Sequence, residues 1–144
     1  MQETRTAGIV AKRLKAAGYE VTTGVGKTGV VGVLRNGDGP TVMLRADMDA
    51  LPVKETTGLK YASTVKAKDN EGELVPVMHA CGHDMHVACL VGAVTLFAKE
   101  RTSWSGTVLA VFQPQGRIHR RGNRAICLAF HGNGTSRVRC RWTI

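Results

Sequence analysis

The stretch His79-Ala80-Cys81-Gly82-His83-Asp84-Met85-His86 carries three imidazoles, a thiol and a carboxylate. Thiolate and neutral imidazole are the ligands that a borderline divalent ion such as zinc prefers. An apolar run, 87–98, follows directly, so we expect a loop that becomes a buried helix, with Asp84 as its capping residue. The pattern predicts a metal or catalytic site, and the alternative is a hydrogen-bonded loop without a ligand.

A second group of charged residues precedes this stretch in the chain. The segment Arg45-Ala46-Asp47-Met48-Asp49-Ala50-Leu51-Pro52 follows a nearly continuous apolar run, 40–44, which we expect to be a strand deep in a sheet. Active sites of open α/β sheets lie at the carboxyl ends of strands. We therefore predict that the two aspartates and His83 lie near each other, while a salt bridge between Arg45 and an aspartate is the purely structural alternative.

The order of the remaining elements defines the expected fold class. Apolar periodicity predicts a helix with Ile9, Val10, Leu14 and Ala17 on one face. The expected elements are a helix over 4–17, strands over 19–23, 30–34 and 40–44, a polar flap over 54–77, a helix from 84 or 85 to 101, and a strand over 107–112. This order predicts an α/β fold with a mixed sheet flanked by helices. We expect Cys89 to be a small core residue of the second helix.

Two glycine-rich segments are interpreted as turns. Residues 24–29 contain a Gly-Lys-Thr, but position 21 is a valine where a phosphate-binding loop has its first glycine, and a strand rather than a helix follows. A hairpin turn is therefore the preferred interpretation. Residues 36–40 also have the composition of a hairpin turn.

Charge divides the chain into two unequal parts. Residues 101–144 contain eight arginines and no acidic residue, whereas residues 1–100 are nearly neutral. No apolar run is long enough for a membrane span, and the first residues have no apolar export signal. The spacing of the four cysteines fits no disulfide framework, so we expect a reducing, cytoplasmic environment.

Three motifs in this order and spacing resemble one family: the two stretches quoted above and Phe112-Gln113-Pro114. They are similar to the metal-dependent amidohydrolase branch of the aminoacylase/carboxypeptidase metallopeptidases, which includes hippurate hydrolases, N-acyl-amino-acid amidohydrolases and auxin-conjugate hydrolases. The resemblance covers roughly residues 2–114, so it implies that 1–114 is part of a catalytic domain with a zinc-peptidase-like fold.

The resemblance implies a site with two divalent ions, zinc, manganese or cobalt, that hydrolyses amide bonds in N-acyl amino acids or small peptides. Cys81 and His83 would be metal ligands and Asp49 would orient the site. The residues that would support it are Arg45, Asp47, His79, Asp84 and His86. The family forms homodimers, and the part that makes the dimer has no counterpart that we can match in this sequence.

The sequence departs from the family immediately after Pro114. The family has two adjacent glutamates there, a general base and a metal ligand, whereas this chain has Gln115-Gly116. We interpret 115–144 as an arginine-rich tail unlike the family, frame-shifted or disordered, and expect impaired activity. An inactive metal-binding fragment is the alternative, and non-specific nucleic-acid binding through the tail is a weaker one.

Overall fold

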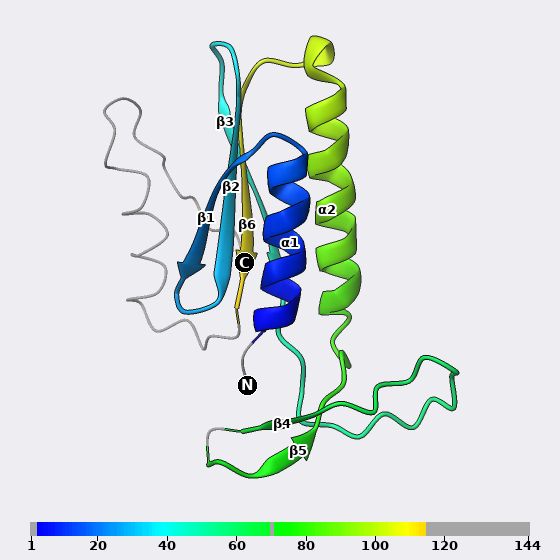
Figure 1. Ribbon diagram of the computed structural model, residues 1–144. Helices are drawn as coiled ribbons and strands as arrows, with labels where there is room; N and C mark the ends of the chain where they lie inside the picture. Colours follow the sequence, from blue (N-terminus) through cyan, green and yellow to red (C-terminus); the bar gives the residue numbers. More distant parts are fainter. Residues whose placement is uncertain (1–2, 70, 115–144) are drawn as a thin grey trace.

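The computed structural model describes residues 3–69 and 71–114. The polypeptide forms a four-stranded sheet with two helices packed on it and a small two-stranded sheet at one end (Figure 1). The expected tail, 115–144, lies outside the described residues. The order of helices and strands is the predicted one, with β4 and β5 inside the expected flap.

The main sheet is mixed, as predicted. Its strands are β1 (Glu20–Val25), β2 (Gly29–Asn36), β3 (Thr41–Asp47) and β6 (Gly106–Gln113), in the spatial order β1-β2-β6-β3. Strands β1, β2 and β6 are antiparallel neighbours, and β3 runs parallel to β6. The β1–β2 hairpin confirms the turn expected near residues 24–29.

Strand β6 changes the interpretation of two sequence segments. It lies between β2 and β3, so residues 36–40 connect two strands that are not paired, and the prediction of a hairpin there was wrong. For the same reason β3 is an edge strand of the described sheet rather than a deeply buried one, and Val42 is 48% exposed. The apolar run identified the strand, but the order of strands depends on a pairing with residues some 65 positions later in the chain.

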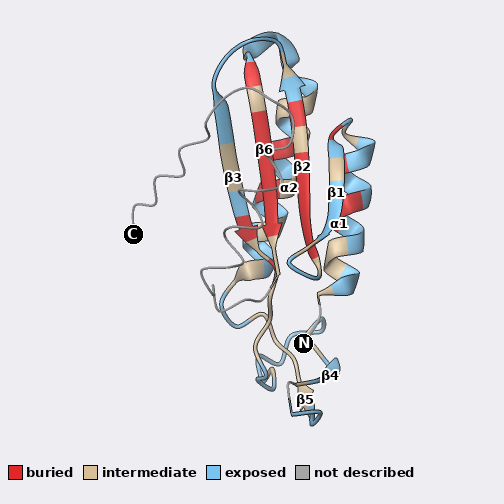
Figure 2. Ribbon diagram, turned by 90° about the vertical axis from the view of Figure 1, so that its left-hand side faces the viewer, coloured by how far each residue is buried: buried red, intermediate tan, exposed pale blue. Residues whose placement is uncertain are grey.

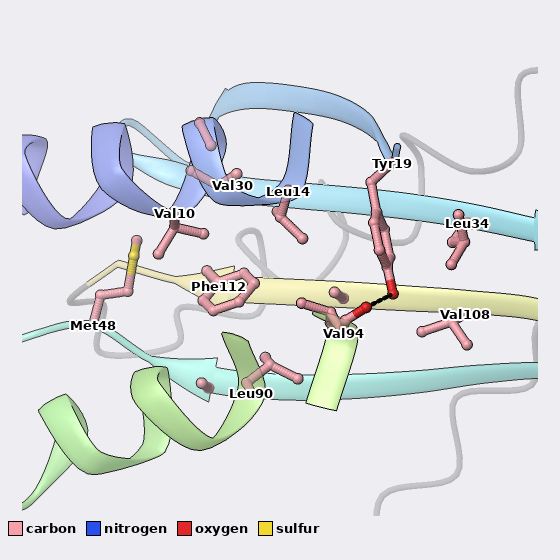
Figure 3. Close-up of a cluster of buried hydrophobic side chains, with 13 residues drawn as sticks. Val10, Leu14, Tyr19, Val30, Leu34, Met48, Leu90, Val94, Val108 and Phe112 are labelled. Carbon is pink, nitrogen blue, oxygen red and sulfur yellow. Dashed lines mark hydrogen bonds between the residues drawn. The ribbon is translucent and has the colours of Figure 1, made fainter. Parts of the chain in front are cut away.

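Both helices, α1 (Thr4–Ala16) and α2 (His83–Lys99), cover the same face of the sheet (Figure 1). Burial is concentrated on β2 and β6 (Figure 2). The core between helices and sheet includes Leu14 from α1, Val94 from α2 and Phe112 from β6 (Figure 3). Gly32 permits the close packing of α1, because a Cβ there would lie 3.0 Å from Leu14 Cδ1.

Three expectations for the helices need correction. On α1, Val10 and Leu14 are buried as predicted, but Ile9 is half exposed and Ala11 is buried in its place. Helix α2 is not buried all round, because Met85 and Leu96 are 63% and 60% exposed. Cys89 is likewise exposed rather than part of the core. Apolar composition indicates which helix surfaces favour contact, but it does not determine whether neighbouring residues cover them.

The polar segment between β3 and α2 contains ordered structure. Strands β4 (Lys66–Lys68) and β5 (Leu74–Pro76) form an antiparallel hairpin, and Asp69 Oδ1 accepts backbone hydrogen bonds in its turn. The short helix η1 (Arg101–Ser103) follows α2. Neither α1 nor α2, the α-helices of the described part, has the length and apolar run that a membrane crossing requires.

Gly106 begins β6 where it meets the connection between β2 and β3. Its φ is +105°, and a Cβ there would collide with the Pro40 carbonyl oxygen. The amide of the next residue, Thr107, donates to that same oxygen at 2.9 Å. The start of β6 is therefore a position that requires glycine.

We predict that Gly106→Ala destabilises the fold by about 1–3 kcal/mol, because the left-handed backbone is strained for alanine. The matched control is Gly8→Ala on α1, where a Cβ meets nothing within 4 Å. The control should stabilise the helix by about 0.5–1 kcal/mol. Urea unfolding measures both changes, and equal effects of the two substitutions would contradict the assignment.

Tyr19, the residue before β1, contacts α2 through a buried hydrogen bond, in which its hydroxyl donates to the Val94 carbonyl oxygen at 3.0 Å (Figure 3). Burial raises the pKa of Tyr19 from 10.0 to about 12, although the Arg101 guanidinium partly opposes this change. The folded state therefore holds the phenolic proton more tightly than the unfolded state does.

The stabilisation from this raised pKa is fully present below pH 10.0 and is lost as the pH rises through about 12. We predict that the difference in unfolding free energy between the unaltered chain and Tyr19→Phe shrinks across this interval. Denaturant unfolding at a series of alkaline pH values measures it. A difference that stays constant would show that burial of the phenol does not control its ionisation.

Candidate metal centre

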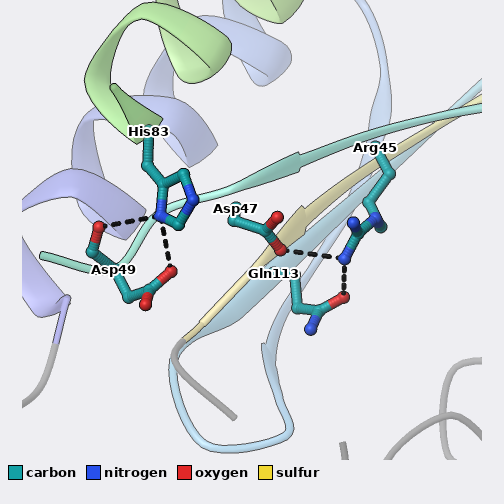
Figure 4. Close-up of polar contacts among 5 residues, drawn as sticks. All are labelled: Arg45, Asp47, Asp49, His83 and Gln113. Atoms are coloured by element: carbon teal, nitrogen blue, oxygen red, sulfur yellow. Dashed lines mark hydrogen bonds and ion pairs between the residues drawn. The ribbon is translucent and has the colours of Figure 1, made fainter. Parts of the chain in front are cut away.

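The most direct contact at the predicted site joins Asp49 and His83. The Nδ1 atom of His83 lies 2.8 Å from Asp49 Oδ1 and 3.2 Å from the Asp49 carbonyl oxygen (Figure 4). Both neighbours are acceptors, so Nδ1 carries a proton and donates it. The Nε2 atom of a neutral His83 is then the nitrogen that can bind a metal, an arrangement typical of metal-binding histidines.

Local structure brings these two residues together across 34 positions of the chain. His83 is the first residue of α2, and Asp49 lies two residues beyond the end of β3. Leu51 and Met78 exchange backbone hydrogen bonds of 2.9 and 3.0 Å, which closes the intervening flap at its base. Gly82, with φ +75°, then turns the chain into α2.

Asp84 does not cap α2 as predicted. The residue before the helix is Gly82, which has no side chain to accept a hydrogen bond, and the helix begins at His83. Asp84 instead lies in the first turn, where its charge is favourable near the positive end of the helix dipole. The sequence placed the boundary one or two residues late, because an aspartate is a better capping residue than a glycine.

Arg45 and Asp47 form a separate polar group with Gln113. Arg45 Nη1 donates to Asp47 Oδ1 at 2.9 Å and to Gln113 Oε1 at 2.7 Å (Figure 4). The Met48 amide also donates to the Gln113 carbonyl oxygen at 2.8 Å. These contacts join the carboxyl ends of β3 and β6. Of the two aspartates, Asp49 makes the predicted contact with His83, whereas Asp47 pairs with Arg45, the structural alternative.

Gln113 is the residue of this region that the sequence did not single out individually. It belongs to the Phe112-Gln113-Pro114 motif, but an amide at a strand end carries no strong chemical signal by itself. The ion pair of Arg45 is partly exposed, with side chains 36% and 24% exposed, so it contributes little to stability, about 0–1 kcal/mol. The structural effect of Arg45 is to orient the Gln113 side chain, to which its guanidinium donates.

The other predicted residues surround the start of α2. Cys81, Asp84 and His86 are exposed, and the rings of His83 and His86 have centroids 5.6 Å apart. The Nδ1 atom of His79 is buried without a hydrogen-bond partner among the described residues. A buried polar atom of this kind requires a partner, such as water or an ion.

The donor types at this end of the sheet suit a borderline divalent ion: an exposed thiol at Cys81 and the oriented imidazole of His83. Their number is small. Among residues 3–69 and 71–114, no group of three or more His, Cys, Asp or Glu side chains converges as a metal-binding set. The described residues therefore fit part of a metal site, since stable zinc sites have three or four protein ligands.

The fold and these motifs are those of one peptidase family. The model of Peptidase family M20/M25/M40 matches residues 43–132, and the chain belongs to this family. The match includes β3, the flap, α2 and β6, and it extends beyond Pro114 into residues outside the described part.

Similar proteins of known identity agree with this assignment. The chain is 48% identical over 115 residues to thermostable carboxypeptidase 2 of Saccharolobus solfataricus, and 47% identical over 113 residues to hippurate hydrolase of Campylobacter jejuni. Each alignment covers 78% of this chain and 27% of the relative. The chain thus spans about a quarter of the length of these relatives.

A solved structure of a dinuclear metal-binding peptidase of the M20 family from Bacillus subtilis has the same fold. Its TM-score is 0.72 and its sequence identity 36%, over 88% of this chain and 34% of that protein. The described elements therefore correspond to part of the Bacillus subtilis peptidase, which is the larger protein. The mixed α/β sheet agrees with the expected fold.

We predict that Asp49→Ala weakens binding of Co²⁺ to the chain by about 10–100-fold, because loss of a residue that orients a metal-binding histidine has this effect. Asp38→Ala is the control, since Asp38 is an exposed aspartate in the connection between β2 and β3. Isothermal titration calorimetry gives both affinities, and circular dichroism verifies folding. Equal affinities for the two variants would contradict the orienting role of Asp49.

Proposed function

We propose that this chain contributes part of the active site of a metal-dependent hydrolase that cleaves amide bonds in N-acyl amino acids or small peptides. The observation that carries the proposal is the Asp49–His83 contact, which leaves His83 Nε2 available as a ligand beside the Cys81 loop. The match to the family supports it, and so do relatives named as a carboxypeptidase and a hippurate hydrolase. The free thiols at Cys81 and Cys89 fit a cytoplasmic protein.

The proposed roles of the residues follow from their positions. Cys81 and the Nε2 atom of His83 would hold one of two divalent ions, zinc, manganese or cobalt, and Asp49 holds the His83 ring in its orientation. Arg45 and Asp47 fix the neighbouring strand ends. The chemistry that the ions supply when bound is Lewis-acid activation of an amide carbonyl and of water.

We also propose that hydrolysis by this chain is impaired. The two residues after Pro114 are glutamine and glycine, and no acidic residue occurs after Glu100. A general base contributes about 10²–10⁴-fold to such reactions. The absence of a third donor among the described residues favours a second candidate, a metal-binding fragment without catalysis. The basic tail of the nucleic-acid-binding alternative lies outside the described residues.

The test is release of glycine from hippurate, and of amino acids from other N-acyl amino acids, with added Mn²⁺, Co²⁺ or Zn²⁺. We expect turnover that is slower than that of a complete relative by about 10²–10⁴-fold, the contribution of a general base. Treatment with EDTA and the substitution Cys81→Ala should each abolish it.

Two other results would decide against this account in different ways. Metal binding that depends on Cys81 without any turnover would favour the non-catalytic fragment. Turnover that survives both EDTA and Cys81→Ala would contradict the proposed metal centre. A near-ultraviolet thiolate-to-Co²⁺ absorption band, present in the unaltered chain and absent in Cys81→Ala, reports ligation independently of activity.

A further inference from the structure

A pocket of about 520 Å³ lies between the start of α1, the flap and the beginning of α2. Its volume is within the range of about 300–1,000 Å³ that is usual for small-molecule sites. Met48 and Ala50 line it, whereas Asp49 between them does not and instead contacts His83. The pocket therefore adjoins the Asp49–His83 pair, because Asp84, the neighbour of His83, also lines it, but neither member of the pair does.

The pocket has charges of both signs that are not paired with each other. Arg5 and Asp84 both line it, and within the described part of the chain neither makes an ion pair or a side-chain hydrogen bond. Their charged atoms are therefore more than the 4.0 Å of a direct ion pair apart. A ligand that carries both charges can bridge such a pair, because each end replaces a missing partner.

The negative end of the pocket contains a second carboxylate. Both oxygens of Glu55 accept hydrogen bonds, one from the Ser63 amide and one from the Thr57 hydroxyl, each at 2.7 Å. These bonds lower the pKa of Glu55, and the nearby charge of Asp84 acts in the opposite direction. Both carboxylates line the same pocket, so this end of it attracts a cationic group.

The rest of the pocket wall is mainly apolar, although Glu3, Thr6 and Ser63 also line it. Val65, Val77 and Met78 come from the flap, and Tyr61, which is 82% exposed, is a large aromatic side chain on the same wall. The half-buried ring of His79 also lines the pocket, and its Nδ1 has no protein partner. An apolar wall with few polar groups of fixed position is typical of sites that select a ligand by both shape and charge.

We propose that this pocket binds a free, zwitterionic amino acid with an apolar side chain. Arg5 binds the carboxylate, Asp84 and Glu55 bind the ammonium group, and the flap residues contact the side chain. An N-acyl amino acid lacks the ammonium group and is excluded by the unpaired acidic end. The inference concerns binding and does not depend on amide hydrolysis by this chain.

The test is calorimetric titration with L-phenylalanine in the presence of EDTA, which separates this pocket from any metal. We expect binding of phenylalanine, and binding weaker by about tenfold for N-acetyl-L-phenylalanine and for L-phenylalaninamide, each of which lacks one charge. Arg5→Gln should lower the affinity for phenylalanine by about tenfold and leave the affinity for phenylalaninamide unchanged, because phenylalaninamide has no carboxylate.

Lys12→Gln is the matched control, since Lys12 is an exposed cation on α1 that does not line the pocket. It should leave every affinity unchanged. The proposal is overturned if phenylalanine does not bind, if either analogue binds as tightly as phenylalanine, or if Arg5→Gln and Lys12→Gln have the same effect. Ala67→Leu, which fills the pocket from β4, provides a second test, and undiminished binding in this variant also overturns the proposal.

Discussion

The pairing of β6 with strands on both of its sides is the constraint on which the rest of the structure depends. Its antiparallel pairing with β2 and parallel pairing with β3 fix the order of the sheet. Phe112 faces the helices from the core, while Val111 belongs to the cluster on the opposite face. The parallel register places Asp47 beside Gln113, and the Met48 amide then bonds to the Gln113 carbonyl. The position of Asp49, one residue later, follows from this pairing.

Segment 47–50 connects the sheet to two chemically different environments. The side chains of Asp47 and Asp49 take part in polar contacts, with Arg45 and His83 respectively. Met48 is fully buried in the core, and it also contributes to the pocket beside α1 together with Ala50. Neighbouring residues of this short segment thus contribute to the polar contact that orients His83 and to the pocket. A shift of the β3–β6 register by one residue would displace both.

Much of the fold could be predicted because its signals are local. Periodicity located the helices, glycine-rich turns separated the strands, and the start of α2 was placed within one or two residues. The order of strands could not be predicted in this way, because β6 inserts between β2 and β3 through distant pairing. The exposure of Cys89 was missed for a related reason: an apolar residue on a helix is buried only if another element covers it.

The sequence identified most residues of the candidate site, but it did not predict which of them contact each other. The His79–His86 stretch and the Arg45–Pro52 stretch both reach the same end of the sheet, as expected. The sequence could not show that Asp49, and not Asp47, contacts His83, since that depends on the direction of each side chain after β3 ends. It also could not show that Arg45 contacts Gln113, because two strands must first be paired.

The central claim is that Asp49 fixes the His83 ring so that Nε2 remains free to bind a metal ion. Two-bond ¹H–¹⁵N correlation spectra of the imidazoles test it most directly, before and after titration with Zn²⁺. The account predicts that His83 carries its proton on Nδ1, and that Zn²⁺ shifts the His83 Nε2 resonance. A proton on Nε2, or a zinc titration that shifts other histidines and leaves His83 unchanged, would contradict it.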